Sequence, residues 1–234
     1  MPSFAGMDEQ LNAGSVRPRG GPAPLGWVLT VRRLAAAMAV LLLFGSDGKA
    51  SEPRRIPLVF HVAERAGEAV APSRFLAEQL AAANEIYVPL GIELVDTAHV
   101  PLAAAHAELV TRADRDALAR QVRKGAIHCF VVAKLMDVDE PGRERRGVHW
   151  HPPQQGQSFL IVSKISMRYV LAHELGHLFG NPRHSDVPGN LMSYTRTEAP
   201  PFLDRAQVRR VQRTLSVLLK DGTLVPLAKS ASAP

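Results

Sequence analysis

Apolar and polar residues follow two periods along the chain, and these predict strands and helices in alternation. Short apolar runs of strand length occur at 55–63, 92–101, 126–135 and 158–165. Apolar residues at helical spacing occur at 73–87, 113–124, 168–179 and 202–220. This order predicts an α/β fold with a mostly parallel, twisted sheet and a C-terminal helix, in which 148–151 is a short edge strand.

Polar residues at the ends of the periodic segments predict where the helices begin. Ser73 is placed to cap the first helix, and Asp204 with Gln207 forms a capping-box pattern at the start of the last helix. After Asp221 no periodic pattern remains, so we expect 223–234 to be a flexible tail.

The first 50 residues contain the three parts of a secretory signal. Arg32 and Arg33 precede an apolar run from Leu34 to Phe44, and small residues follow up to Ala50. This run of 11 residues is too short for a membrane span, which needs about 20. We therefore expect cleavage near Ala50, a secreted or periplasmic mature protein, and no stable membrane span after removal of the signal.

Charge and cysteine content narrow the class of protein. The formal net charge is +6, but residues 1–50 hold five Lys/Arg against three Asp/Glu, which leaves +4 for the rest. No basic stripe is interleaved with aromatic residues, so we expect no nucleic-acid partner. The single cysteine, Cys129, excludes an internal disulfide and lies in an apolar run, where we expect it to be buried in a strand.

The stretch HELGHLFGNPRHSD at 173–186 begins with the pattern H-E-x-x-H, which is typical of zinc hydrolases. On a helix, His173 and His177 lie one turn apart on the same face, so both imidazoles can reach one metal ion. Glu174 falls beside them, where it suits a general base. Ala172, Leu175, Leu178 and Phe179 fill the rest of this helix with apolar groups. Buried polar groups need partners, which a metal supplies.

This motif, a later histidine and the methionine of GNLMSY together resemble the metzincin clan of zinc endopeptidases, over about Ile56 to Leu219. The resemblance implies one catalytic Zn²⁺, a tight turn at Gly180, and Met192 beneath the site. The sequence MSY is similar to the M-x-Y of astacin-like and serralysin-like members. In those proteins the tyrosine helps to hold the oxyanion, which makes Tyr194 the candidate for that role.

The third metal ligand departs from the pattern of the clan, which places a histidine three residues after the glycine. Arg183 occupies that position, and His184 follows it. Because an arginine does not bind a cation, Arg183 should point to solvent. A loop can absorb one extra residue, so His184 is the predicted ligand, and Asp186 is the alternative because carboxylates also bind zinc.

The remaining histidines give less specific predictions. His149 and His151 would share one face of a strand, so we expect them to line the edge strand beside an extended substrate, with a second metal site as the alternative. We expect the isolated histidines to be structural, namely His61, His99, His106 and His128.

The residues together predict a secreted zinc endopeptidase that acts on proteins or peptides, with Glu174 activating a water on the zinc. The catalytic domain would span 51–222, with its active-site helix at 168–179, after an extension and signal at 1–50. Two alternatives stay open: a non-catalytic, zinc-stabilised binding domain, and a zinc hydrolase of non-peptide amides. Glu174 favours an enzyme, because a structural zinc site needs no base and usually closes with a fourth protein ligand.

Overall fold

The structure is a computed structural model that describes residues 52–153 and 157–228. The predicted signal and its cleavage site lie outside these residues, and the export of the chain stays a prediction. Within the described part, no helix is long and apolar enough to cross a membrane.

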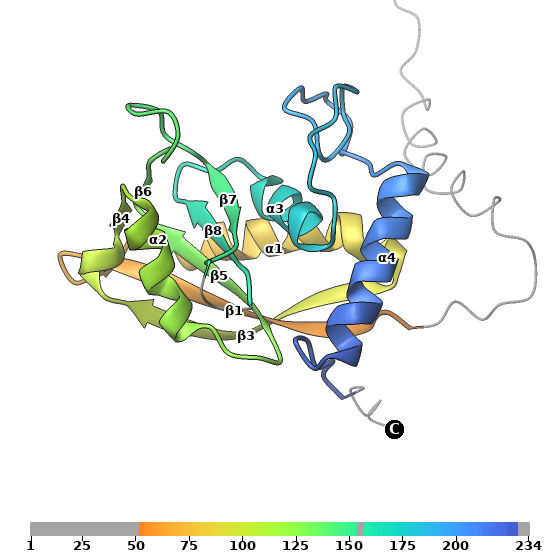
Figure 1. The fold of residues 1–234 in the computed structure, drawn as a ribbon, viewed down its shortest axis with the longest axis horizontal. Coiled ribbons are helices and arrows are strands. Elements are labelled where there is room, and N and C mark those ends of the chain that lie inside the picture. Colours follow the sequence, from red (N-terminus) through yellow and green to blue (C-terminus); the bar gives the residue numbers. More distant parts are fainter. Residues whose placement is uncertain (1–51, 154–156, 229–234) are drawn as a thin grey trace, which may run out of the picture. The chain divides into compact units, whose positions relative to one another are not determined.

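The first apolar run becomes β1 (Arg54–Arg65), on which the main sheet is built. It pairs in parallel with β3 (Ile92–Leu102) and with β5 (Ile127–Val132), and β5 pairs in parallel with β8 (Phe159–Ser163). Beyond β8 lies the antiparallel strand β7 (Gly147–Trp150) at the end of the sheet (Figure 1). The predicted α/β class, with its mostly parallel twisted sheet and edge strand, is confirmed.

Both faces of the central strand β5 are covered, as its apolar sequence predicts. Cys129 and Val131 belong to one hydrophobic cluster, whereas Phe130 and Val132 belong to a second cluster across the sheet. All six residues of β5 are buried, Cys129 among them. This alternation follows from the two-residue period of a strand that is packed on both sides.

Helices of unequal length cover the two faces. The first cluster includes residues of α1 (Ser73–Tyr87), α3 (Val170–Leu178) and α4 (Arg205–Lys220). The second includes residues around α2 (Arg112–Ala117), which continues as a 3₁₀ turn at Leu118–Gln121 instead of the single longer helix predicted. The remaining short elements are β2 (Glu68–Ala69), β4 (Glu108–Leu109), β6 (Lys134–Leu135) and 3₁₀ turns at Val88–Leu90 and Ala104–His106.

Two predicted boundaries are wrong. Pro72 is the N-cap of α1 and Ser73 is its first helical residue, because Pro72 already has the extended backbone of a cap position. The apolar run at 126–135 divides at Ala133, whose N–H donates to the carbonyl of Ala107. Beyond this break, β6 pairs with β4 in a separate two-stranded sheet. Hydrophobicity could not show the break, because both pieces are largely apolar.

The chain after α4 is also ordered further than predicted. The capping box of Asp204 and Gln207 is present at the start of α4. After its end, Leu224 is buried at 2% exposure, and the Leu227 N–H donates to the Arg55 carbonyl at 2.8 Å. The expectation of a flexible tail is therefore wrong for 223–228, because one apolar side chain anchors this segment to the core.

We expect Leu224→Ala to lower the free energy of unfolding by about 2–4 kcal/mol, because it removes a buried side chain and leaves a cavity. Val225→Ala is the matched control, since Val225 is 56% exposed and its loss should cost less than about 1 kcal/mol. Urea denaturation of both variants measures the difference. Equal stability of the two variants would mean that the tail is not docked as described.

Candidate metal centre

The motif helix α3 is buried along most of its length. All residues from Val170 to Gly176 are buried, including the polar His173 and Glu174. Two glycines let other segments approach this helix closely. A Cβ at Gly147 in β7 would lie 2.8 Å from Glu174 Oε1, and a Cβ at Gly176 would lie 2.4 Å from Met192 Sδ. The edge strand β7 and the Met192 segment therefore both pack closely against α3. A side chain at either glycine would force these segments away from the helix.

Three histidines converge at the end of this helix. His173, His177 and His184 each offer one ring nitrogen, and these atoms lie within 4.8 Å of one another. His184 is brought back by a turn at Gly180, whose φ of 88° is the left-handed conformation that glycine adopts freely. Among the described residues, this is the one group of three or more potential ligands close enough to hold a metal ion.

The two helical histidines are oriented by hydrogen bonds to backbone carbonyls. His173 Nδ1 donates to Leu191 O at 2.7 Å, and His177 Nδ1 donates to Asn181 O at 2.8 Å. A carbonyl only accepts, so Nδ1 carries the proton in both rings, and Nε2 is left with its lone pair. This is the arrangement in which proteins present imidazole to a metal.

The electrostatic environment keeps the triad uncharged. Burial lowers the pKa of His173 to about 4, and it also lowers the pKa of His177 and of the more exposed His184. Neighbouring histidines lower the pKa of His173 and His177 further. Only a neutral imidazole binds a metal. The residues therefore fit a cation such as Zn²⁺, which takes nitrogen ligands and in catalytic sites has three protein ligands and one open position.

Glu174 lies beside the triad with 6% of its surface exposed. Burial raises the pKa of its carboxyl to about 8, while the backbone N–H of His149 and the charge of Arg145 act in the opposite direction. A metal cation held by the histidines would favour the ionised carboxylate. The position and environment of Glu174 suit a group that accepts a proton during the reaction.

The segment beneath the site is held by residues that the motif does not indicate. Asn190 Oδ1 accepts from the Met192 N–H at 2.9 Å, and the Asn190 amide exchanges hydrogen bonds with Gln207 of α4. Met192 itself has no exposed surface. Asn190 therefore connects the capping box of α4 to the Leu191 carbonyl that orients His173. No sequence pattern in the chain points to this link.

Tyr194 follows this segment and lies against the triad from the solvent side. Its ring centroid is 4.3 Å from that of His184 and 6.0 Å from that of His173, and 65% of the residue is exposed. The structure therefore places Tyr194 at the mouth of the site, and its role in oxyanion binding stays a prediction.

The other predicted site residues lie outside the triad. Asp186 is exposed and does not belong to the ligand group, and Arg183 is exposed, as expected. His149 is partly buried on β7 beside the site, whereas His151 is exposed. Among the described residues, no third potential ligand lies close enough to these two histidines to form the alternative second metal site. His61 and His128 form a buried pair with 2.8 Å between ring nitrogens, which their separation in sequence does not reveal.

A cleft with a cavity of about 950 Å³ opens over the triad and Glu174. One wall is formed by β7 and the loop before it, and the other by the segment that carries His184 and Tyr194. Its remaining lining is rich in arginine and includes Arg115, Arg143, Arg145, Arg146 and Arg196.

No protein-family model and no curated protein matches the chain. Among solved structures, it is similar to metalloproteinase-II from Bacteroides fragilis, with 16% identity and a TM-score of 0.49 over 69% of this chain and 53% of that one. It is also similar to archaemetzincin from Methanopyrus kandleri, with 18% identity and a TM-score of 0.45 over 72% and 98%. The chain thus spans about half the length of the Bacteroides protein, and neither likeness assigns it an activity.

We expect His184→Ala to weaken zinc binding by at least about 100-fold, because the two remaining imidazoles cannot close a three-ligand site. The zinc affinity of Asp186→Ala should stay within about threefold of that of the unchanged protein. Asp186 lies outside the triad, so it can affect the metal only indirectly, through the ligands. Competition with a chromogenic chelator at fixed pH measures both affinities. Tight binding by His184→Ala together with a loss in Asp186→Ala would identify the carboxylate as the ligand.

Proposed function

We propose that the described part of the chain is a zinc-dependent peptidase that hydrolyses peptide bonds in proteins or peptides. The observation that supports this most is the triad of converging histidines beside a buried glutamate on an open cleft. A purely structural site would have little use for such a carboxylate and would usually close with a fourth ligand. We further propose that the enzyme is an endopeptidase and that the mature chain is exported, as the first 50 residues predict.

His173, His177 and His184 would hold the ion. Bound Zn²⁺ would supply Lewis acidity, which lowers the pKa of a water and polarises the carbonyl of the scissile bond. The hydrogen bonds from Nδ1 of the two helical histidines to backbone carbonyls fix their rings before the ion arrives. This pre-organisation reduces the cost of assembling the site.

Glu174 would remove the proton from the attacking water and then deliver it to the leaving amine. The close approach of β7 at Gly147 and the hydrogen bond from the His149 N–H restrict the carboxylate to one side of the cleft. Tyr194 would donate its hydroxyl hydrogen to the oxygen on which negative charge develops. With 65% of its surface exposed at the mouth of the site, Tyr194 is accessible to a bound substrate.

The end strand of the sheet would align the substrate. β7 has no further partner strand in the described part of the chain, and its residues line the cleft. An extended peptide can add to such an edge through backbone hydrogen bonds, which recognise the main chain of any sequence. This mode of binding favours peptides over small amides, because a small amide has too little main chain to pair with the strand.

We expect Glu174→Gln to retain zinc while its kcat on peptides blocked at both ends falls by about 10²- to 10⁴-fold, because the amide has the same shape but cannot act as a base. Metal analysis and chromatography of the products measure the two properties. Glu68→Gln is the matched control, because Glu68 is exposed on β2, away from the cleft. Undiminished turnover by Glu174→Gln would favour another base, and cleavage confined to unblocked peptides would refute the endopeptidase proposal.

We expect Tyr194→Phe to lower kcat by about tenfold and to change KM by less than about twofold. A hydroxyl that binds only the developing oxyanion stabilises the transition state more than the bound substrate. Steady-state kinetics on one blocked peptide measure both constants, and the zinc content serves as the control for damage to the packing on His184. An unchanged kcat would mean that Tyr194 does not take part in catalysis.

A further inference from the structure

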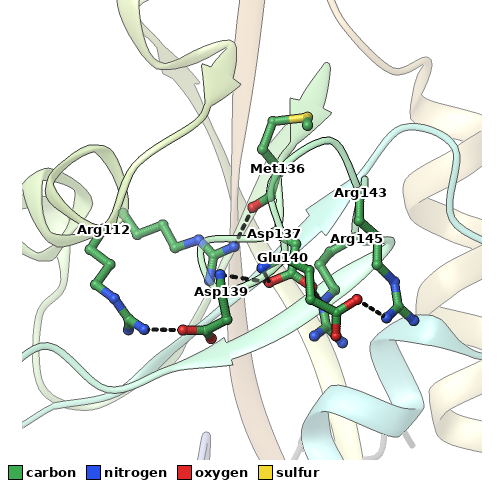
Figure 2. Close-up of polar contacts among 8 residues, drawn as sticks. Arg112, Met136, Asp137, Asp139, Glu140, Arg143 and Arg145 are labelled. Carbon is green, nitrogen blue, oxygen red and sulfur yellow. Dashed lines mark hydrogen bonds and ion pairs between the residues drawn. The ribbon is translucent and has the colours of Figure 1, made fainter.

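Three arginines around the loop that follows β6 already have acidic partners. Figure 2 draws the residues of these pairs, which lie on the loop between β6 and β7 and, for Arg112, at the start of α2. The pairs are Arg112 with Asp139, Arg143 with Glu140, and Arg145 with Asp137. The positive charge of these three arginines is therefore largely neutralised within the protein.

Three further arginines of the cleft, Arg115, Arg146 and Arg196, have no ion pair among the described residues. Arg115 is buried, lies over the Trp150 ring and donates to the Met136 carbonyl, whereas the other two lie at the other end of the lining.

Arg146 precedes β7 and is exposed, and its Nη1 lies 3.5 Å from the sulfur of Met167. Arg196 follows Tyr194 and is partly buried, and its Nη1 donates to the Leu191 carbonyl at 3.2 Å. They belong to opposite walls of the cleft. Arg146 contacts Met167, just before α3, and Arg196 lines a cavity together with Met167 and Val170.

A smaller cavity of about 160 Å³ adjoins the cleft at this point. Met167, Val170 and Arg196 line both cavities. The other cation of the small cavity, Arg168, is paired with Glu85 at 2.9 Å. The small cavity thus offers apolar contacts from Met167 and Val170 beside Arg196, which has no acidic partner. Arg146 contacts Met167 and therefore lies close to the same cavity.

We propose that this end of the cleft binds the carboxylate of an acidic side chain in the substrate, and that Arg146 and Arg196 are specificity-determining residues. This inference rests on the proposed peptidase function. The occupant would be an Asp or Glu side chain near the scissile bond, whose methylene groups pack on the apolar contacts while its carboxylate pairs with the guanidinium groups.

The environment of Arg196 supports this choice of ligand. Burial lowers the pKa of its guanidinium below the usual range, although an arginine remains charged at any physiological pH. A partly buried charge without a counter-ion is unfavourable, and a substrate carboxylate would remove that penalty. One further acidic residue, Glu144, lines the cleft and is exposed. Its backbone forms a β-bridge with Met136, and among the described residues its carboxylate has no ion pair with Arg146 or Arg196.

Binding is tested first, with the zinc-loaded Glu174→Gln variant and fluorescent peptides amidated at the C-terminus. The peptides differ only by Glu or Gln at one position near the centre, and each position is tried in turn. At one position or more, we expect the Glu peptide to bind about 10- to 100-fold more tightly at low salt. The preference should weaken as salt rises. Equal affinity at every position would overturn the proposal.

Two substitutions identify the residues responsible. Arg146→Gln and Arg196→Gln should each reduce the Glu-to-Gln affinity ratio by about tenfold, and Arg146→Glu should shift the preference toward a peptide with Lys at that position. Arg209→Gln is the matched control, because Arg209 is exposed on α4 and does not line the cleft. Because Arg196 shares the Leu191 carbonyl with His173, the zinc content of its variant is measured as well. A ratio unchanged in both Gln variants would refute the assignment.

Cleavage of the same peptides by the protein with Glu174 intact separates this inference from the proposed function. Cleavage without an acidic preference in either kcat/KM or affinity would support the peptidase and refute the role of the arginines. An acidic preference in binding without any cleavage would refute the peptidase and retain the carboxylate site.

Discussion

The site depends on one constraint, which is the burial of a polar motif on an otherwise apolar helix. His173 and Glu174 lie in a helix that also forms part of the hydrophobic core. Their polar atoms must find partners there, because an unpaired buried polar group is strongly destabilising. Backbone carbonyls accept one hydrogen from each helical histidine, and the His149 N–H reaches the glutamate. What remains unpaired is the set of ring nitrogens that face one another, which is the requirement for a metal site.

The absence of side chains at two glycines makes this arrangement sterically possible. With a Cβ at Gly147, the edge strand would overlap Val170 and Glu174, and with a Cβ at Gly176, Met192 would lose its place beneath the helix. The helix is therefore packed closely from two sides at the level of its functional residues. Such packing limits the positions of Glu174 and the Leu191 carbonyl without any bond to the ion, and rigid support of this kind is what a catalytic site requires.

Much of the fold follows from patterns of the sequence, whereas the support of the site does not. The strand periods gave the sheet, and H-E-x-x-H gave three of the residues that meet at the cleft. The errors fall where a pattern has two interpretations. The apolar run at 126–135 fits one strand or two, and the segment after Asp221 is too short to show a period although Leu224 docks in the core. The carbonyls of Leu191 and Asn181 could not be predicted, because a backbone carbonyl is the same in every residue. The side chain of Asn190 could not be predicted either, because its partner Gln207 is 17 residues away in a different element.

His184 stands one residue later than the sequence pattern of the clan expects. The contacts of the loop explain why it still reaches the other two histidines. The first two histidines are fixed by helical phase, so an insertion between them would move one ring to another face. After Gly180, the chain leaves the helix, and the Ser185 N–H donates to the Met192 carbonyl at 3.0 Å. His184 is thus positioned by a contact between two loops, on the same segment that orients His173 through Leu191. This contact fixes the position at which the loop ends, but it does not fix the number of residues in the loop. Arg183 can therefore project into solvent while the imidazole of His184 still meets the other two.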